Sequence, residues 1–264
     1  MLKDKSQVDK QREIFDRQIH EDIGSMPQAG TLKLDNWMQS YLNRIFGIFK
    51  EMRIGEQGKI LDIGCGAFGW IPVTAMAHGF ALSCGIEISL MACRYADIFG
   101  KRSVPDRFPY YAQCSADSIC FKGEVFDAVT CIALLEHVVD DDEVIGEMAR
   151  ILKSNGIAYI MVPNDYKKIP FFLRWYYRRV DRKMGHLRHY SRSELIEKLS
   201  RLGFVEITFY TSGHMIKMFQ YLLTVLIPAL NAPSSRLWWF LEKLDLRSPD
   251  NDYGVTLTVV ARKG

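Results

Sequence analysis

One short segment combines closely spaced glycines with nearby carboxylates, a pattern suited to binding a nucleoside. Gly64, Gly66 and Gly69 form a G-x-G-x-x-G pattern directly after the apolar run KILDI at 59–63. Glycines in that place let the backbone approach a ligand closely, and a following helix offers free N–H groups. Glu87 ends the next predicted strand, where a carboxylate can accept hydrogen bonds from both ribose hydroxyls. The pattern therefore predicts a cofactor that contains a nucleoside.

Asp62 separates two classes of cofactor that share this arrangement. A dinucleotide site usually has a small or apolar residue two places before the first glycine, because the pyrophosphate is anionic. A carboxylate there repels a pyrophosphate but suits a ligand that carries an ammonium and a sulfonium group. Asp62 thus favours S-adenosylmethionine. An NAD(P)-linked oxidoreductase is the alternative from another class, and a regulator that binds the cofactor without turnover is a third.

The apolar pattern predicts a sheet that would position these residues. Short apolar runs indicate strands at 59–63, 81–86, 109–114, 125–132 and 157–162, and helical spacing indicates helices at 70–78, at 88–99 and before the fifth strand. Strands that alternate with helices of about 10–15 residues are typical of a parallel, doubly wound α/β sheet. An amphipathic helix over 36–52, with Asp35 as its N-cap, precedes the first strand.

Several motifs follow one another in the order of a known enzyme family. They are LDIGCG (61–66), SAD with ICF (115–121), FDAV (126–129), ALLEHV (133–138) and EMARILKSNG (147–156). In these motifs the sequence resembles class I S-adenosylmethionine-dependent methyltransferases, of the small-molecule group that includes the ubiquinone- and menaquinone-type methylases. The resemblance covers about residues 35–211 and a terminal strand at 254–262. It implies transfer of a methyl group from S-adenosylmethionine to a small-molecule or lipid-like acceptor, at oxygen or carbon.

The same resemblance implies a fold and a division of the chain. The expected fold is a Rossmann-like, seven-stranded sheet with an antiparallel last strand, N-terminal helices and a helical insertion between strands six and seven. Residues 204–210 and 254–262 are the expected last two strands. One domain over 1–264 would comprise a helical cap (1–57), a cofactor-binding core (58–163), substrate-cap segments (164–250) and the terminal strand (251–264).

The resemblance also implies which residues contact the cofactor. They are Asp62, Gly64, Cys65, Gly66, Phe68, Glu87, Ile88, Ser115, Ala116, Asp117 and Ala133. Phe68 is expected near the methionine end of the cofactor. Ser115 stands where the family usually has an aspartate that reads the adenine amino group, so either Asp117 or Ser115 would take that role.

A second group of residues with possible chemistry lies in GHLRHYS, residues 185–191. In the enzymes that this chain resembles, such a segment follows the fifth strand and borders the substrate opening. Imidazole titrates near neutrality, so His186 or His189 is a candidate general base for a hydroxyl acceptor, and Arg188 is a candidate to orient it. Loop packing is the structural alternative, together with capping of a following helix by Ser191. No metal ligands are expected.

Residues 167–183 (KKIPFFLRWYYRRVDRK) hold seven basic residues, five aromatic residues and one acid, Asp181. A solvated basic helix packed through its aromatic side chains explains this composition. The alternative interpretation is a helix at a membrane interface, where anionic lipids attract the Lys and Arg side chains. Apolar residues at 215–240 could extend that surface or cover the acceptor. The alternative function is therefore a peripheral membrane methyltransferase of a lipid-linked or isoprenoid substrate.

Composition and charge limit which partners and which cellular location the chain is expected to have. The chain has 264 residues, of which 48% are hydrophobic, and a net charge of +3, which is too small to argue for nucleic acid. Residues 131–134 read CIAL rather than the D/N-P-P-Y tetrad of enzymes that methylate base nitrogen, so a nucleic-acid partner is not expected. A charged N-terminal segment and six cysteines without paired spacing favour a cytoplasmic protein with reduced thiols. The oligomeric state is left open.

Overall fold

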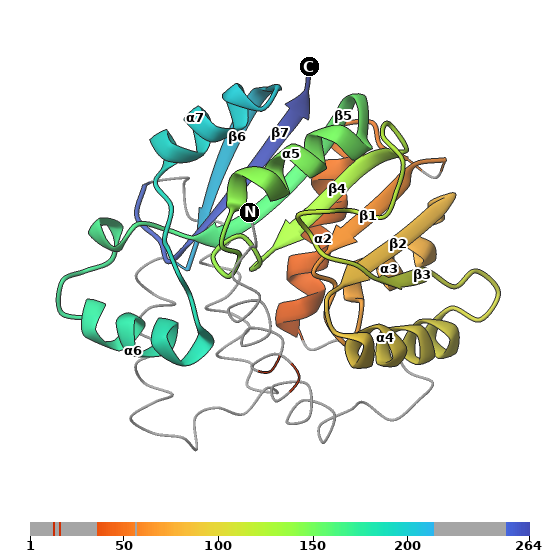
Figure 1. Cartoon of the computed structure of the whole chain (residues 1–264), viewed down its shortest axis with the longest axis horizontal. Helices are drawn as coiled ribbons and strands as arrows, with labels where there is room; N and C mark the ends of the chain where they lie inside the picture. Colours follow the sequence, from red (N-terminus) through yellow and green to blue (C-terminus); the bar gives the residue numbers. More distant parts are fainter. Residues whose placement is uncertain (1–12, 14–15, 17–35, 56, 214–251) are drawn as a thin grey trace.

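Seven strands and the helices between them make up the described part of the chain (Figure 1). In this computed structural model, the described residues are 13, 16, 36–55, 57–213 and 252–264. The strands are β1 (Lys59–Ile63), β2 (Leu82–Glu87), β3 (Tyr110–Gln113), β4 (Phe126–Ile132), β5 (Leu152–Pro163), β6 (Phe204–Ser212) and β7 (Thr256–Lys263). The helices are α2 (Asn36–Glu51), α3 (Trp70–Ala77), α4 (Leu90–Ser103), α5 (Asp141–Ile151), α6 (Arg174–Met184) and α7 (Arg192–Arg201), with a short 3-10 helix, η1 (Tyr166–Lys168).

The strands form one sheet in the order β3-β2-β1-β4-β5-β7-β6. Neighbouring strands from β3 to β5 are parallel, whereas β7 is antiparallel to both β5 and β6. The predicted Rossmann-like sheet with an antiparallel last strand is therefore confirmed. The strand order reverses between β1 and β4, and ligands of such sheets bind outside the carboxyl ends of the strands at that point.

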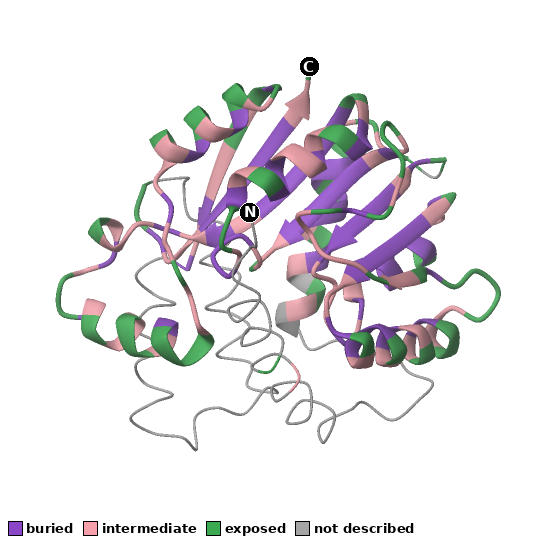
Figure 2. Ribbon diagram, viewed as in Figure 1, coloured by how far each residue is buried: buried purple, intermediate pink, exposed green. Residues whose placement is uncertain are grey.

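Helices cover both faces of the sheet, whose strands are largely buried (Figure 2). On one face, Leu42 and Phe49 of α2 lie in the same hydrophobic cluster as Tyr159 of β5. On the other face, Met148 of α5 and Leu195 of α7 pack into the larger cluster. Full burial of a side chain such as Phe49 stabilises the fold by about 1.5–3 kcal/mol. This packing supports the sheet beneath the loops at its carboxyl edge.

Two elements are longer than the apolar pattern predicts. β5 begins at Leu152 rather than at residue 157, because Phe126 pairs with Leu152 before a bulge shifts the register. α4 continues to Ser103 rather than ending at residue 99. Lys101 and Arg102 occupy its last turn, where cations favour the helix dipole, and Lys101 lies 2.7 Å from Asp97.

Some expectations fall on residues outside the described ranges. These are the Asp35 cap, most of the helical cap at 1–57, and the helical insertion between β6 and β7 with the apolar residues at 215–240. The division of the chain into cap, core and substrate segments stays a prediction.

The segment GHLRHYS lies across the carboxyl edge of β4 and β5. Tyr190 is fully buried, its N–H donates to the carbonyl of Pro163 at 3.0 Å, and its hydroxyl donates to Leu135 O at 3.0 Å and to Asp141 Oδ2 at 2.9 Å. Ser191 caps α7 by accepting a hydrogen bond from the Glu194 N–H, as the sequence predicts. Tyr190 thus anchors the histidine-bearing segment to the strand ends.

Tyr190→Phe is expected to lower the free energy of unfolding by about 1–2 kcal/mol, because two buried acceptors lose their shared donor. Urea unfolding followed by circular dichroism measures the change. Tyr110→Phe is the matched control, since Tyr110 is 57% exposed. Equal stability of the two variants would contradict the anchoring role.

Candidate functional site

The glycine loop begins where β1 ends at the carboxyl edge of the sheet. Gly64, Gly66 and Gly69 have φ values of 74°, 62° and 50°, which glycine adopts without steric cost. The N–H groups of Gly64 and Cys65 donate to the Ile86 carbonyl at 2.9 and 3.1 Å, so the loop turns back over β2. Gly69 then precedes the first turn of α3 as its N-cap.

The three glycines differ in what surrounds them. A Cβ atom on Gly69 would lie 2.3 Å from the Tyr111 hydroxyl, and one on Gly64 would lie 3.2 Å from a methyl group of Leu134. A Cβ atom on Gly66 would meet no atom of the described structure within 4 Å. Gly66 is partly exposed and, as far as the described residues go, borders open space at the loop, where a ligand could approach the backbone.

Asp62 is a buried carboxylate directly before this loop. It is 5% exposed, and its Oδ1 accepts a 2.6 Å hydrogen bond from the Thr130 hydroxyl. Burial, with a smaller contribution from the nearby Glu87, raises the pKa of Asp62 to about 7, against the effect of the Thr130 bond. A cationic ligand would offset the cost of ionising this group. The residues therefore fit a ligand with an ammonium or sulfonium group.

Glu87 lies beside the glycine loop at the end of β2. Its Oε2 accepts from Gly66 N–H at 3.2 Å, and its Oε1 accepts from the N–H groups of Ile88 and Ser89 at 2.8 and 3.3 Å. Burial raises the pKa of Glu87, while these three bonds oppose the rise. Backbone donors thus hold the carboxylate in one orientation next to the open space at Gly66, as binding of ribose hydroxyls requires.

The aromatic residue of the loop belongs to a small cluster. Phe68 stacks on Trp70 with ring centroids 5.4 Å apart, and both rings meet Phe99 of α4 edge-on. Cys65 lies against Gly85 of β2, and burial raises the pKa of its thiol well above the ordinary value. Contacts of Phe68 and Cys65 with the cofactor stay predictions.

The remaining predicted cofactor residues follow β3 and β4. Ser115, Ala116 and Asp117 are half-buried, and a turn closes there through a hydrogen bond from Ser118 N–H to Ser115 O at 3.2 Å. Ala133 follows β4 and is exposed, with a φ of 50°. A non-glycine residue in this region stores local strain, which is common at ligand sites. Their roles also stay predictions.

A second cluster joins both candidate histidines through a residue that sequence reasoning did not select. Asp181 of α6 lies with Oδ1 2.8 Å from His186 Nδ1 and with Oδ2 3.0 Å from His189 Nε2. The hydroxyl of Tyr166 donates to the same Oδ2, and Nδ1 of His189 lies 2.6 Å from the carbonyl oxygen of Asn164. Asp181 was the only acid in a basic segment, and that was the signal available in the sequence.

The side chains after β4 complete this cluster. Glu136 and His137 are 2% and 4% exposed, and the His137 ring meets His186 edge-on with centroids 4.8 Å apart. Burial raises the pKa of Glu136 to about 7. Burial, with a smaller contribution from the neighbouring His186, lowers the pKa of His137 to about 4. His137 is therefore neutral at physiological pH.

Arg188 binds Asp141, whereas the two histidines contact Asp181. Its guanidinium donates to Asp141 Oδ1 at 2.7 Å and to the carbonyls of Val138 and Val139 at 3.0 and 2.7 Å. These bonds hold the loop after β4 against the segment that carries His186. The predicted role of Arg188 in orienting an acceptor stays a prediction, and its described contacts support the loop.

Carboxylate and imidazole groups are also ligands of divalent metals. Glu136, His137 and His186 converge with one side-chain atom each within 4.8 Å, and so do Asp181, His186 and His189. Both oxygens of Asp181 already lie against imidazole nitrogens, so ion pairing accounts for that set. Removal of metal ions by EDTA therefore distinguishes a metal site from a cluster of ion pairs.

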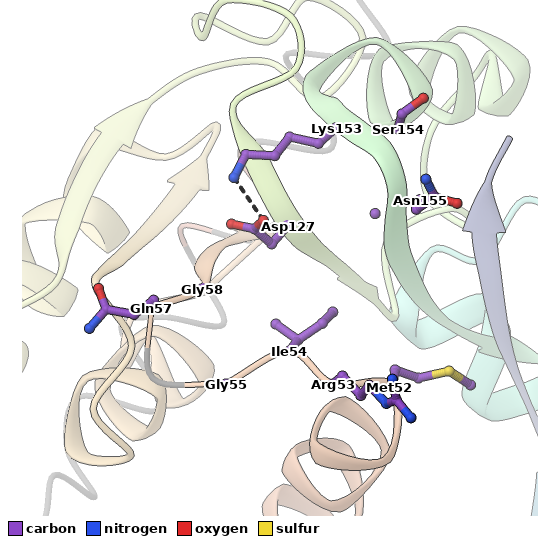
Figure 3. Close-up of a pocket in the computed structure, with 11 residues that line it drawn as sticks. Met52, Arg53, Ile54, Gly55, Gln57, Gly58, Asp127, Lys153, Ser154 and Asn155 are labelled. Atoms are coloured by element: carbon purple, nitrogen blue, oxygen red, sulfur yellow. Dashed lines mark hydrogen bonds and ion pairs between the residues drawn. The ribbon is translucent and has the colours of Figure 1, made fainter.

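A hollow of about 710 Å³ lies at the opposite edge of the sheet (Figure 3). The chain before β1 and the bulge of β5 line it, and Lys153 and Asp127 form a 2.7 Å ion pair at its wall. This hollow adjoins the amino ends of the strands. It is therefore separate from the glycine loop and from the histidine cluster, which is formed by Asp181, His186 and His189. None of the helices in the described part of the chain has the length and apolar character needed to cross a bilayer.

Comparison of the sequence with known proteins identifies the family of the chain. Residues 33–208 match the family described as a methyltransferase domain. The ubiquinone biosynthesis O-methyltransferase of Haemophilus ducreyi is 30% identical over 135 residues, covering 49% of this chain and 51% of that protein. The one from Paracidovorax citrulli is 32% identical over 112 residues, covering 42% and 45%. The match thus spans about half the length of these curated relatives.

Solved structures share the fold at low sequence identity. The Haemonchus contortus phosphoethanolamine N-methyltransferase 2, in complex with S-adenosyl-L-methionine, has a TM-score of 0.57 at 19% identity, over 84% of this chain and 52% of that chain. The [4+2]-cyclase SpnF has a TM-score of 0.60 at 17% identity, over 95% and 93% of the two chains. One fold therefore supports different reactions, and the site must decide among them.

Proposed function

The chain belongs to the methyltransferase domain family and depends on S-adenosylmethionine, and from that premise we propose that it methylates a hydroxyl group of a small, quinone-like acceptor. The observation that carries the proposal is the buried carboxylate of Asp62 beside the open space at Gly66. It favours a cationic cofactor over a pyrophosphate, which also argues against the NAD(P) alternative.

The residues at the glycine loop would hold the cofactor by complementary charge and hydrogen bonding. Asp62 would face the cationic methionine end, Glu87 would accept from the ribose hydroxyls, and residues 115–117 would line the adenine. When bound, the cofactor supplies a methyl group activated by a sulfonium. Much of the rate enhancement then comes from holding the acceptor oxygen in line with that methyl group.

Oxygen is the favoured acceptor atom for two reasons. The curated relatives are named as O-methyltransferases. Two imidazoles, those of His186 and His189, lie at the same carboxyl edge as the cofactor loop, and an imidazole that is neutral can accept the proton of a hydroxyl. A lipid-like acceptor with an isoprenoid tail is part of the same proposal, whereas methylation at carbon is the alternative outcome of the test.

Product analysis tests the acceptor class. The protein is incubated with S-adenosylmethionine labelled in its methyl group and with 4-methylcatechol, with a catechol bearing a farnesyl tail, or with 2-hydroxy-1,4-naphthoquinone. We expect a labelled methyl ether, formed faster with the farnesyl tail. Glu87→Ala, which removes the proposed ribose acceptor, should give none. Label at nitrogen or only at a ring carbon, or no labelled product, would contradict the proposal.

We also propose that α6 contacts an anionic membrane surface from the cytoplasmic side. Phe171 and Trp175 are 80% and 62% exposed. Trp175 and three arginines of α6 (Arg178, Arg179 and Arg182) surround a hollow of about 520 Å³. Asp181, the only acid of the helix, is 8% exposed. Among the described residues, the outer face of α6 therefore carries aromatic rings and positive charge without a compensating carboxylate, which supports binding to anionic headgroups.

Vesicle pelleting tests this surface. The protein is expected to pellet with phosphatidylglycerol vesicles at low salt, to lose binding at 1 M NaCl, and to ignore phosphatidylcholine vesicles. Arg178→Gln with Arg179→Gln should weaken binding about 30-fold, at roughly 1 kcal/mol per base removed, two bases in all. The control pair Lys101→Gln with Arg102→Gln removes the same charge from α4. Equal loss in both pairs would mean that net charge alone attracts the vesicles.

A further inference from the structure

Asp181 lies on α6 but its contacts are with the histidine segment. It is 8% exposed, whereas the neighbouring arginines of α6 line the outer hollow. Burial would raise the pKa of Asp181, but the contacts from His186, His189 and Tyr166 outweigh it and hold the pKa well below the ordinary value. Asp181 is therefore an ionised carboxylate, which can only accept hydrogen bonds.

The two imidazoles that face Asp181 are not equivalent. His189 has the Asp181 carboxylate at Nε2 and the Asn164 carbonyl at Nδ1, at 3.0 and 2.6 Å. Both partners only accept, so both nitrogens of His189 carry hydrogen and the ring is an imidazolium. Burial lowers its pKa, but the bonds to Asp181 and Asn164 outweigh this and raise it. An imidazolium has no lone pair with which to accept a proton.

His186 has only one nitrogen against Asp181. Its Nδ1 lies 2.8 Å from Oδ1 of Asp181, although the angle between them is not that of a hydrogen bond. Because the carboxylate only accepts, a neutral ring is favoured with its hydrogen on Nδ1, facing Oδ1, which leaves the lone pair on Nε2. The described structure contains no hydrogen bond to Nε2 of His186. The edge-on ring of His137 fixes the plane of the imidazole.

We propose that Asp181 is a positioning residue that selects His186, rather than His189, as the base of the methyl transfer. The inference rests on the proposed function. The acceptor O–H proton passes to Nε2 while the oxygen forms its bond to the methyl carbon. The carbon–sulfur bond breaks and sulfur keeps its electron pair. Asp181 holds Nδ1–H throughout and stabilises the imidazolium that forms, as the carboxylate of a catalytic triad does.

The charged groups around His186 come from four segments. Asp181 lies on α6, Tyr166 on η1, His189 on the same segment as His186, and Glu136 and His137 follow β4. His137 is neutral, and the positive charge of His189 is compensated by the Asp181 carboxylate. Removal of that carboxylate takes away the acceptor that faces Nδ1 of His186.

The first measurement does not require an acceptor. The tautomer of His186 is read from the NMR chemical shifts of ¹⁵N-labelled histidine in the full chain with S-adenosylhomocysteine and EDTA, and His186→Gln assigns the signals. We expect the neutral ring of the wild type to carry its hydrogen on Nδ1, and Asp181→Asn to move the population toward hydrogen on Nε2. Tyr166→Phe, which keeps the carboxylate, should change the population less. The same tautomer population in Asp181→Asn as in the wild type would overturn the proposal.

The second measurement uses methylation of the farnesyl catechol in EDTA. General-base catalysis contributes about 10²–10⁴-fold, so His186→Gln and Asp181→Asn should each lower kcat at least 10²-fold. The KM for S-adenosylmethionine should stay unchanged. Asp181→Glu should have a higher kcat than Asp181→Asn, because it keeps the carboxylate. The fall in kcat should be smaller for His189→Gln than for His186→Gln.

Three results would overturn the assignment. The first is a kcat that falls as much in His189→Gln as in His186→Gln, or more. The second is an unchanged kcat in Asp181→Asn. The third is loss of wild-type activity in EDTA, which would mean that these residues bind a metal. Melting curves show whether each variant folds. If Asp181→Asn does not fold, the kcat values of Asp181→Glu and Tyr166→Phe test the role of Asp181 instead. If the wild type methylates none of the catechols, the proposed function fails, while the NMR measurement still tests whether Asp181 fixes the tautomer of His186.

Discussion

Asp62→Asn is expected to abolish measurable binding of S-adenosylmethionine and, at the same time, to stabilise the cofactor-free protein at alkaline pH. The carboxylate is the proposed partner of the cationic methionine end, and an amide cannot supply its charge. Asparagine has nearly the same shape and can still accept the hydrogen bond from Thr130. The fold should therefore persist while cofactor affinity falls at least 10²-fold, or about 2.7 kcal/mol.

The gain in stability follows from the direction in which burial moves the Asp62 pKa. Burial raises the folded-state pKa to about 7, above the value of about 4 in an unfolded chain. A raised pKa means that the folded state binds the proton more tightly. Its stabilising contribution is complete below about pH 4 and is lost as pH rises through about 7. Ionisation then costs the cofactor-free protein up to about 4 kcal/mol, because each pH unit between the two pKa values corresponds to about 1.4 kcal/mol.

Thermal unfolding at pH 5.5 and 8.5, with calorimetric titration of S-adenosylhomocysteine and S-adenosylmethionine, measures both effects. The melting temperature of Asp62→Asn should exceed that of the wild type at pH 8.5 and approach it at pH 5.5. Asp127→Asn is the matched control, since Asp127 pairs with Lys153 at the opposite edge of the sheet. Intact cofactor affinity in Asp62→Asn would contradict the site. A lower melting temperature at pH 8.5 would contradict the electrostatic account.

Gly66→Ala and Gly69→Ala are expected to separate binding from folding within one loop. A Cβ atom at Gly66 enters the open space proposed for the cofactor, so affinity should fall at least tenfold, or about 1.4 kcal/mol. Its φ of 62° should cost only about 1–2 kcal/mol of stability. At Gly69 the Cβ atom would overlap the Tyr111 ring, with 2.3 Å to the hydroxyl, so stability should fall by about 3 kcal/mol or more.

Urea unfolding and calorimetry of the cofactor-free and cofactor-bound protein distinguish the two glycines. Gly146→Ala in α5 is the control, since a Cβ atom there meets no described atom within 4 Å. Alanine in a helix should stabilise it by about 0.5–1 kcal/mol without affecting the cofactor. If Gly66→Ala binds S-adenosylhomocysteine as the wild type does, the cofactor does not approach the backbone at that residue.

The strands and the cofactor loop could be predicted because their signals are local. β1 and β4 follow apolar runs, and Ser191 caps α7 from a spacing of three residues to Glu194. The early start of β5 could not be predicted, because Leu152 becomes a strand residue only by pairing with Phe126. The extra turn of α4 depends on a few charges at its end, which shift a helix boundary without changing its existence.

The histidine cluster shows the limit of sequence reasoning most clearly. His186 and His189 were selected by residue type, but their difference depends on Asn164 after β5 and Asp181 on α6. Arg188 was selected as an acceptor-binding residue, whereas its described bonds go to Asp141 and the loop after β4. No spacing in the sequence encodes these contacts, because each joins segments that meet only after the sheet has formed.

By itself, the sequence determined the class of cofactor. Asp62, the glycines and Glu87 lie within two consecutive strands and their turns, so local geometry brings them together in any fold that contains the unit. Only the tertiary structure decided which groups face the candidate base. Hydrogen-bond partners set the tautomer and charge of an imidazole, and the partners of His186 and His189 come from separate segments that the carboxyl edge of the sheet assembles.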